Sequence, residues 1–320
     1  MKFISIPENY ASLEGGLVYD IDLEGLRDTV EVSIINSGTG EVAATLRFAQ
    51  TALISLDIAP YVRRMFDPQP ATGLSGCIAD AGRVAEVTVA VDGVRSPSRR
   101  YTPMLFDRLP RLLTTLPGRR TLAAGECDEV AFYAPAGGHI HLDIERPAGI
   151  ERTTIDLPAE DKISLFILSA DSLPDDAVAA DLIFESGGRT ESISYDRAVR
   201  PAGAVRLAWV AASGAIESYT FPSHRRTLTV TRDAFCSRTG HRTVSRGNET
   251  RRLLLSDYEP QALIEALEEI LSARRVWCME GGCATETEVL TAETLRRFDG
   301  PLNTLTLEIR NISAKEGCLC

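Results

Sequence analysis

A chain of 320 residues, 44% hydrophobic and 25% charged, has the composition of a folded globular protein and is long enough for two or three domains. Its net charge of −11 argues against affinity of the whole surface for nucleic acid or for an anionic membrane. The apolar N-terminal stretch ends at Pro7, which makes it too short for a signal peptide, and no run approaches the roughly 18 apolar residues of a membrane span. We therefore expect a protein that is cytoplasmic when it is synthesised.

Residues 1–100 are predicted to form an N-terminal β domain. Short alternating segments are separated by turns that contain Gly, Asn or Pro, a spacing typical of a β-sandwich. The clearest pair is a hairpin of residues 29–35 and 41–48. Residues 59–66 fit a short helix, because Pro60 suits the first turn.

Residues 101–200 are predicted to hold a connector and a second β domain. The Pro- and Arg-rich stretch 95–118 is interpreted as the connector between the domains. Strands are predicted at residues 129–134, 139–145, 162–168, 180–184 and 190–195.

Residues 201–320 are predicted to form a C-terminal α+β domain that opens with the strongest hairpin signal of the chain. Residues 205–211 and 216–221 alternate as strands, and Gly214 lets the chain reverse because glycine adopts positive φ without steric cost. The residues that carry this hairpin are Trp209, Gly214, Glu217, Tyr219 and Phe221. Its aromatic side chains would supply a large buried area, and a core hairpin without any direct functional role is the simpler interpretation.

One long amphipathic helix is predicted after the hairpin. Ser256 and Glu259 have the spacing of a capping box. Apolar residues then fall on one helical face at positions Leu263, Ile264, Leu267, Ile270 and Leu271. The predicted fold is thus mainly β, with two or three small β-sandwich or β-barrel-like domains in series and one amphipathic helix in the C-terminal α+β part.

The segment 139–145 has the sharpest chemical pattern. On a strand, His139, His141 and Asp143 share one side with Glu145, because side chains alternate between the faces. Two imidazoles two residues apart can chelate a transition metal, and a carboxylate could complete or orient the site. The simpler interpretation is the solvent-exposed face of a strand.

The seven cysteines are odd in number and scattered, so reduced thiols are expected in a chain without an export signal. A four-thiolate zinc site of Cys278, Cys283, Cys318 and Cys320 is a weak alternative, because the spacings differ from the usual Cys-x2-Cys pairs.

A basic patch lies between residues 224 and 252, where eight arginines stand against only Asp233 and Glu249. Such a patch could dock on an acidic partner or touch a nucleic-acid backbone, although a solvated β-ribbon is the simpler interpretation. Too few aromatic residues are interleaved for single-strand stacking. The patch comprises Arg225, Arg226, Arg232, Arg238, Arg242 and Arg246.

No phosphate-binding loop, nucleophile elbow, zinc-protease motif or dinucleotide-binding fingerprint occurs in the sequence. No pair of carboxylates stands out as a catalytic pair. The sequence therefore predicts neither a cofactor nor an enzymatic activity.

The hairpin pattern Leu207-x-Trp209 … Gly214-x-x-Glu217-x-Tyr219-x-Phe221 resembles a segment of structural proteins from phages and prophages of Bacteroidales. Two further segments fit the same proteins: Ile54-x-Leu-Asp-Ile58 with Tyr61-Val-Arg-Arg-Met-Phe66, and Val276-Trp-Cys-Met279 after the helix. The resemblance implies a virion or tail-assembly component built from stacked β domains, and it implies no catalytic residue.

We therefore expect a non-enzymatic structural subunit of a phage or prophage tail-like particle. Edge strands of β modules can pair between subunits, so its partners would be other subunits, including copies of itself, and it would reside in the particle after assembly. One alternative is a β module that binds carbohydrate or another surface ligand through exposed aromatic residues. The other is a metal-dependent hydrolase that uses His139 and His141.

Overall fold

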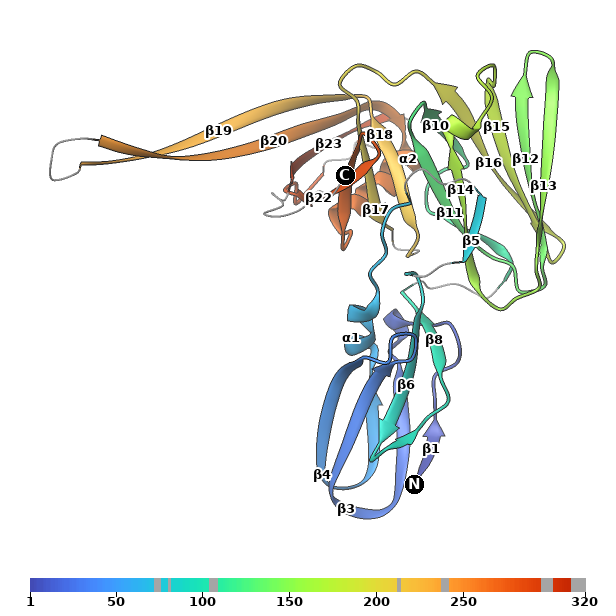
Figure 1. The fold of residues 1–320 in the computed structure, drawn as a ribbon, viewed down its shortest axis with the longest axis vertical. Coiled ribbons are helices and arrows are strands. Elements are labelled where there is room, and N and C mark those ends of the chain that lie inside the picture. The colour runs from blue at the N-terminus through green and yellow to red at the C-terminus, as the bar shows by residue number, and fades with distance from the viewer. Residues whose placement is uncertain are drawn as a thin grey trace.

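The computed structural model describes residues 1–71, 76–79, 82–103, 109–211, 214–236, 242–294 and 302–311. It confirms a mainly β protein with several sheets and two short α-helices. Figure 1 shows an N-terminal body at one end, two further β bodies side by side at the other, and a long two-stranded ribbon that projects from the molecule. None of the described helices is long and apolar enough to cross a membrane.

The N-terminal body is a seven-stranded sheet with its own core. Its strands are β1 (Lys2–Ser5), β2 (Ala11–Ser12), β3 (Val18–Asn36), β4 (Val42–Asp57), β6 (Ala85–Val91), β7 (Val94–Arg95) and β8 (Arg99–Thr102). Alternate residues of β3 and β6 are fully buried, and the hydroxyls of Tyr19 and Tyr101 meet inside at 2.7 Å. The sheet therefore curls around one hydrophobic core.

The hairpin predicted in this body is confirmed as β3 and β4, and both strands are longer than predicted. Pairing is interrupted between Asp22 and Arg27, where Glu24 and Gly25 have φ of 57° and 145°. The predicted short helix is confirmed as α1 (Ala59–Val62), which has a proline in its first turn and continues as a 3-10 turn, η2 (Arg63–Met65). A second 3-10 turn, η1, spans Leu13–Gly15.

The middle body is a β-sandwich. Its five-stranded sheet runs in the order β10 (Arg119–Ala123), β16 (Arg189–Ala198), β15 (Ala179–Ser186), β12 (Gly138–Arg146) and β13 (Gly149–Leu157). Its four-stranded sheet runs in the order β5 (Gly76–Ala79), β14 (Ile163–Ser169), β11 (Cys127–Tyr133) and β9 (Arg111–Leu113). The inner faces meet in a core where the rings of Phe132 and Phe184 lie 5.8 Å apart, and η3 (Ala170–Ser172) follows β14.

The connector is more structured than an ordinary linker. Within residues 95–118, β8 pairs in the N-terminal sheet and β9 pairs in the middle sandwich. In addition β5, at residues 76–79, pairs with β14 of the sandwich although it precedes β6 of the N-terminal sheet. The chain therefore crosses between these two bodies more than once.

The C-terminal body is a seven-stranded sheet covered by the amphipathic helix. Its order is β18 (Ile216–Phe221), β17 (Val205–Val210), β21 (Val276–Glu280), β22 (Cys283–Val289), β23 (Leu302–Asn311), β20 (Arg242–Pro260) and β19 (Ser223–Cys236). Helix α2 (Gln261–Glu268) and the 3-10 turn η4 (Glu269–Leu271) bury Ile264, Leu267 and Ile270 against Leu254, Leu305 and Leu307. The predicted apolar face of the helix is thus confirmed.

The predicted capping box is wrong. Ser256 lies within β20, and helix α2 begins after Pro260 without a side-chain cap. Ser256 and Glu259 instead both contact the hydroxyl of Tyr219, at 2.9 and 3.0 Å. Strand β20 continues through the segment that resembled a helix start, because its pairing with β23 extends to Pro260.

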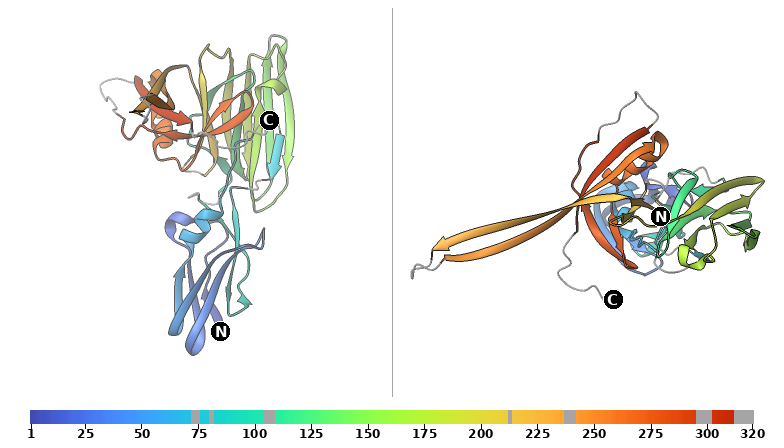
Figure 2. Two further views of the ribbon diagram at one scale, coloured as in Figure 1. Left: turned by 60° about the vertical axis from the view of Figure 1, so that its left-hand side comes forward. Right: turned by 90° about the horizontal axis from the view of Figure 1, so that it is seen from above.

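Strands β19 and β20 form the projecting ribbon. They pair without interruption from Ser223 opposite Leu255 to Cys236 opposite Arg242. Strand β20 pairs with β23 from Arg251 onward, so among the described strands residues 242–250 have β19 as their one neighbour. The right-hand view of Figure 2 shows this ribbon leaving the body.

Candidate functional site

The predicted hairpin is confirmed as β17 and β18, in register from Val205 opposite Phe221 to Val210 opposite Ile216. Trp209 is fully buried, and within the described chain its indole Nε1 has no hydrogen-bond partner. Gly214 has a φ of 77°, as a reversal requires. These residues build the core of the C-terminal body, which is the simpler of the two interpretations of the hairpin.

Glu217 is a buried carboxylate that ties the hairpin to the connector. It accepts hydrogen bonds from the Thr114 hydroxyl and from the amide and hydroxyl of Thr115 at 2.5 to 2.7 Å, and from the Leu116 amide at 3.4 Å. Buried carboxylates are tolerated when donors surround them in this way. Its role is therefore to join two parts of the fold.

Tyr219 and Phe221 complete the hairpin core, with ring centroids 5.0 Å apart in an edge-to-face arrangement. Burial raises the pKa of the Tyr219 phenol, and the neighbouring Glu259 adds to the effect. The phenol thus stays protonated and can donate to Glu259.

A buried ionic network that the sequence did not reveal joins the hairpin to the middle sandwich. The Arg206 guanidinium on β17 lies 3.4 Å from Glu126 and 3.5 Å from Asp128, and it donates to the Cys127 carbonyl at 2.8 Å. All three ionisable side chains are at most 5% exposed. The signal in the sequence was a lone arginine between Val205 and Leu207, inside an apolar strand pattern.

The network continues between the two sheets of the sandwich. Asp128 on β11 accepts from Arg120 on β10 at 2.7 Å and from the hydroxyl of Tyr195 on β16 at 2.9 Å. Burial by itself lowers the pKa of Arg120, whereas the nearby Asp128 carboxylate raises it. The net shift of this pKa is upward. A second buried pair, Arg83 with Glu129, joins the N-terminal region to β11.

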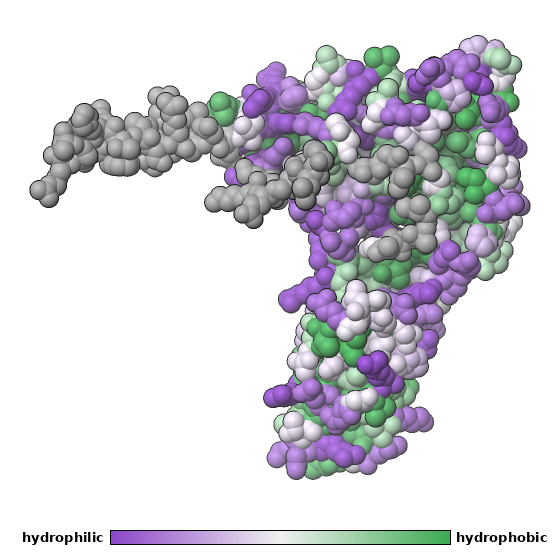
Figure 3. Space-filling model, viewed as in Figure 1, coloured by the Kyte–Doolittle hydropathy of each residue, from purple (hydrophilic) through white to green (hydrophobic). Residues whose placement is uncertain are grey.

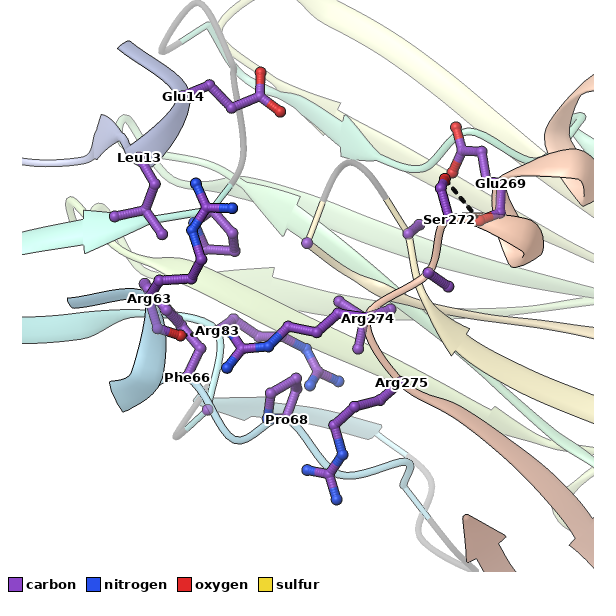
Figure 4. Close-up of a pocket in the computed structure, with 16 residues that line it drawn as sticks. Leu13, Glu14, Arg63, Phe66, Pro68, Arg83, Glu269, Ser272, Arg274 and Arg275 are labelled. Atoms are coloured by element: carbon purple, nitrogen blue, oxygen red, sulfur yellow. Dashed lines mark hydrogen bonds between the residues drawn. The ribbon is translucent and has the colours of Figure 1, made fainter. Parts of the chain in front are cut away.

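A cavity of about 300 Å³ lies where the N-terminal and C-terminal bodies meet. Figure 4 shows Arg63, Arg83, Arg274 and Arg275 around it. Arg274 donates to the carbonyl of Arg63, and Arg275 pairs with Asp67 while its guanidinium lies 5.0 Å from the Trp277 ring. At least these two arginines serve contacts at the junction between the bodies.

The candidate metal residues lie on β12, on the outer face of the five-stranded sheet. The rings of His139 and His141 stack at 5.9 Å. His139 Nδ1 contacts Asp156 at 2.9 Å, whereas His141 contacts Thr154 at 2.9 Å and Glu185 at 3.6 Å.

Asp143 does not turn toward the histidines as a ligand. Arg152 donates to both of its oxygens, at 2.6 and 2.5 Å, and thereby lowers the pKa of this carboxyl. In the part of the chain that the structure describes, no group of three or more His, Cys, Asp or Glu residues could hold a metal ion.

Four described cysteines, Cys77, Cys127, Cys278 and Cys283, are thiols that form no disulfide. Burial, with Glu280 nearby, raises the pKa of Cys278 to about 11, so this thiol stays protonated. Cys318 and Cys320, the other members of the zinc alternative, lie outside the described residues.

The basic patch lies on the projecting ribbon. Arg225 and Arg226 are exposed at its base, and Arg232, Arg242 and Arg246 lie further out on β19 and β20. Arg238 lies outside the described residues. The ribbon is therefore the part of the molecule with both an unusual shape and a distinct charge.

The body surface has no comparably distinct feature in the view of Figure 3, where hydrophilic and hydrophobic residues are interspersed. The carbohydrate-binding alternative predicts an exposed aromatic cluster, and among the Trp, Tyr and Phe residues whose side chains the structure describes, none is exposed.

Comparisons with known proteins add no family. No family model matches the chain, and no curated protein matches it. Among solved structures, the chain is similar to an endo-fucoidan hydrolase from glycoside hydrolase family 107, with 10% sequence identity and a TM-score of 0.18. The match covers 79% of this chain but 41% of that hydrolase chain, and a likeness this weak carries no argument about function.

Proposed function

We propose that the protein is a non-enzymatic structural subunit that assembles through its projecting ribbon into a phage or prophage tail-like particle. The observation that carries the proposal is the ribbon itself, in which residues 228–236 and 242–250 pair with each other and with no other described strand. An isolated two-stranded hairpin is marginally stable in water, so a long one is expected to pack on a partner. The type of particle is inferred from the resemblance of the hairpin and its flanking segments.

The rest of the structure supports a rigid subunit rather than a hinged enzyme. Buried ion pairs join the N-terminal region and the C-terminal body to the sandwich, through Arg83 with Glu129 and Arg206 with Glu126. A rigid body holds the ribbon in a fixed direction, which assembly of identical subunits requires. In this proposal the protein is made in the cytoplasm and then resides in the particle.

Shortening the ribbon tests the proposal. Thr227 and Arg251 are register partners, so a two-residue Asn-Gly turn can replace residues 228–250 and close a short hairpin. We expect the full-length protein to show, by light scattering, a mass that exceeds one chain and rises with concentration. The shortened variant should remain a single chain and keep the circular dichroism spectrum of a folded β protein.

Equal masses for the two proteins at every concentration would contradict the proposal. The shortened variant keeps the body of the C-terminal sheet, so it should unfold cooperatively. If its unfolding transition is lost, the variant is misfolded, and a variant that lacks only residues 232–246 takes its place in the test.

A further inference from the structure

The two faces of the ribbon differ in charge. Because side chains alternate along a strand, the register of β19 with β20 assigns its residues to two faces. One face carries five arginines, no acidic residue and several aliphatic residues, whereas Asp233 and Glu249 both belong to the other face. We call the first the arginine face, defined by Arg226, Arg232, Arg242, Arg246 and Arg252.

Arginines stand directly opposite each other on this face. Arg226 pairs in register with Arg252, and Arg232 with Arg246. Like charges at cross-strand positions are destabilising. Arg252 is already paired with Glu280, so the positions on this face that an anionic partner would serve lie further out, at Arg232 and Arg246.

The arginine face is also the continuation of a covered face. At the base of the ribbon, Leu254 belongs to the same face and is fully buried in the core of the C-terminal body. Further out, Leu228 on this face is 58% exposed. A face that is covered inside the body thus becomes uncovered where the ribbon leaves it.

An acidic counterpart lies on the middle sandwich. Residues 101–200 hold 17 acidic against ten basic residues. On the outer side of the five-stranded sheet, away from the core, the register gathers six carboxylates. We call this surface the acidic sheet face, defined by Asp143, Glu145, Asp156, Asp181, Glu185 and Asp196.

Little basic charge offsets these carboxylates. Arg152 pairs with Asp143 and Arg119 pairs with Asp196, both at or below 2.7 Å. Among the described residues, no arginine or lysine forms an ion pair with the other four carboxylates. Asp181 also lies directly opposite Asp143, so Arg152 offsets one of two neighbouring negative charges there.

The two surfaces match in length but cannot meet within one chain. The free ribbon has nine register pairs, and β12 and β13 have nine residues each, so all span roughly 30 Å at about 3.3 Å per residue. In Figure 1 and in the right-hand view of Figure 2 the ribbon points away from the sandwich of its own chain.

We propose that the arginine face of one copy docks on the acidic sheet face of a second copy of this chain. The proposal rests on the assembly function proposed above and names the partner of the ribbon. Such a contact joins two different surfaces, so repetition gives a ring or an open stack. Opposite charges would steer the encounter and make it sensitive to salt.

Two neutralising variants test the contact. Arg232→Gln with Arg246→Gln removes charge from the arginine face, and Asp181→Asn with Glu185→Gln removes charge from the acidic sheet face. We expect each to weaken self-association by roughly tenfold or more in sedimentation at low salt. A matched control, Thr231→Glu with Thr243→Glu, changes the net charge of the ribbon by the same amount on the opposite face and should associate like the wild type.

Mixing the two variants gives the sharper outcome. The intact ribbon of the sheet-face variant can dock on the intact acidic sheet face of the ribbon variant, so the mixture should form a two-chain complex that neither variant forms alone. The inference is overturned if either variant self-associates as strongly as the wild type. It is also overturned if self-association of the control is weakened as much as that of the ribbon variant, or if the mixture contains only single chains.

Other outcomes identify a different partner. If the wild type binds a fluorescein-labelled DNA duplex and loses that binding with Arg232→Gln and Arg246→Gln, while self-association is unchanged, the arginine face binds nucleic acid and the inference is wrong. If self-association is lost when the ribbon is shortened but is unchanged by Asp181→Asn with Glu185→Gln, this inference is wrong and the proposed assembly function stands. A wild type that stays one chain at all concentrations contradicts both.

Discussion

At the scale of single residues, the most informative group is Glu217, a carboxylate inside a hydrophobic core. Four donors from Thr114, Thr115 and Leu116 surround it, so its desolvation is compensated by hydrogen bonds. Because those donors belong to the connector, a single side chain fixes where the connector meets the C-terminal hairpin.

Replacing Glu217 with Ala should destabilise the fold strongly. The substitution leaves several buried donors without an acceptor and creates a cavity, so we expect a loss of about 3 kcal/mol or more in the free energy of unfolding. Glu217→Gln keeps the shape and one carbonyl acceptor, so its loss should be clearly smaller. Urea denaturation of both variants measures the difference, and equal losses would show that the hydrogen bonds contribute little.

At the scale of elements, the base of the ribbon is held by an ion pair between two strands. Arg252 on β20 pairs with Glu280 on β21. The hydrogen bond from Arg252 lowers the pKa of Glu280, and although partial burial raises this pKa, the net shift is downward. A carboxyl with a lowered pKa in the folded state stabilises the fold above its unfolded pKa and loses that contribution as the pH falls.

Arg252→Gln should therefore have a pH-dependent cost. The Glu280 side chain is 51% exposed, so solvent screening limits the loss at neutral pH to about 0.5–1 kcal/mol. The difference from the wild type should shrink as the pH falls through the lowered pKa of Glu280, because Glu280 then becomes protonated in the folded state as well. Unfolding curves at pH 7 and pH 3 measure the loss in the free energy of unfolding, with Arg225→Gln as a control. A loss that is the same at both pH values would show that it comes from the packing of the Arg252 stem and not from the ion pair.

At the scale of the whole molecule, the buried ionic network decides how the bodies are joined. Arg206 extends from the C-terminal hairpin to Glu126 and Asp128 of the sandwich. Removing one partner of a buried ion network leaves an uncompensated charge, which is far more costly than losing an exposed pair.

Arg206→Ala is expected to lower the free energy of unfolding by about 3–5 kcal/mol and to loosen the junction of the sandwich with the C-terminal body. Arg200→Ala is the matched control, because Arg200 lies 4.0 Å from Glu126 and is 32% exposed, and it should cost about 1 kcal/mol or less. Hydrogen exchange of the backbone amides of β11 and β17 measures directly how often this junction opens. Equal effects of the two variants would show that the network does not hold the bodies together.

The sequence by itself determined the class of elements in this protein. Alternation predicted the hairpins of β3 with β4 and of β17 with β18, since local strand pairing across a short loop depends on neighbouring residues. The 3.6-residue period likewise predicted that Ile264 and Leu267 would be buried.

Only the tertiary structure decided which distant strands meet. The placement of β5 beside β14, the pairing of Asp143 with Asp181 and the contact of Arg206 with Glu126 all join residues tens of positions apart. Sequence alternation predicts that a residue faces outward or inward, but it does not predict which other strand supplies its neighbour. The basic patch was visible in the sequence, whereas the register of a long two-stranded ribbon decided that its arginines share a face without an acidic residue.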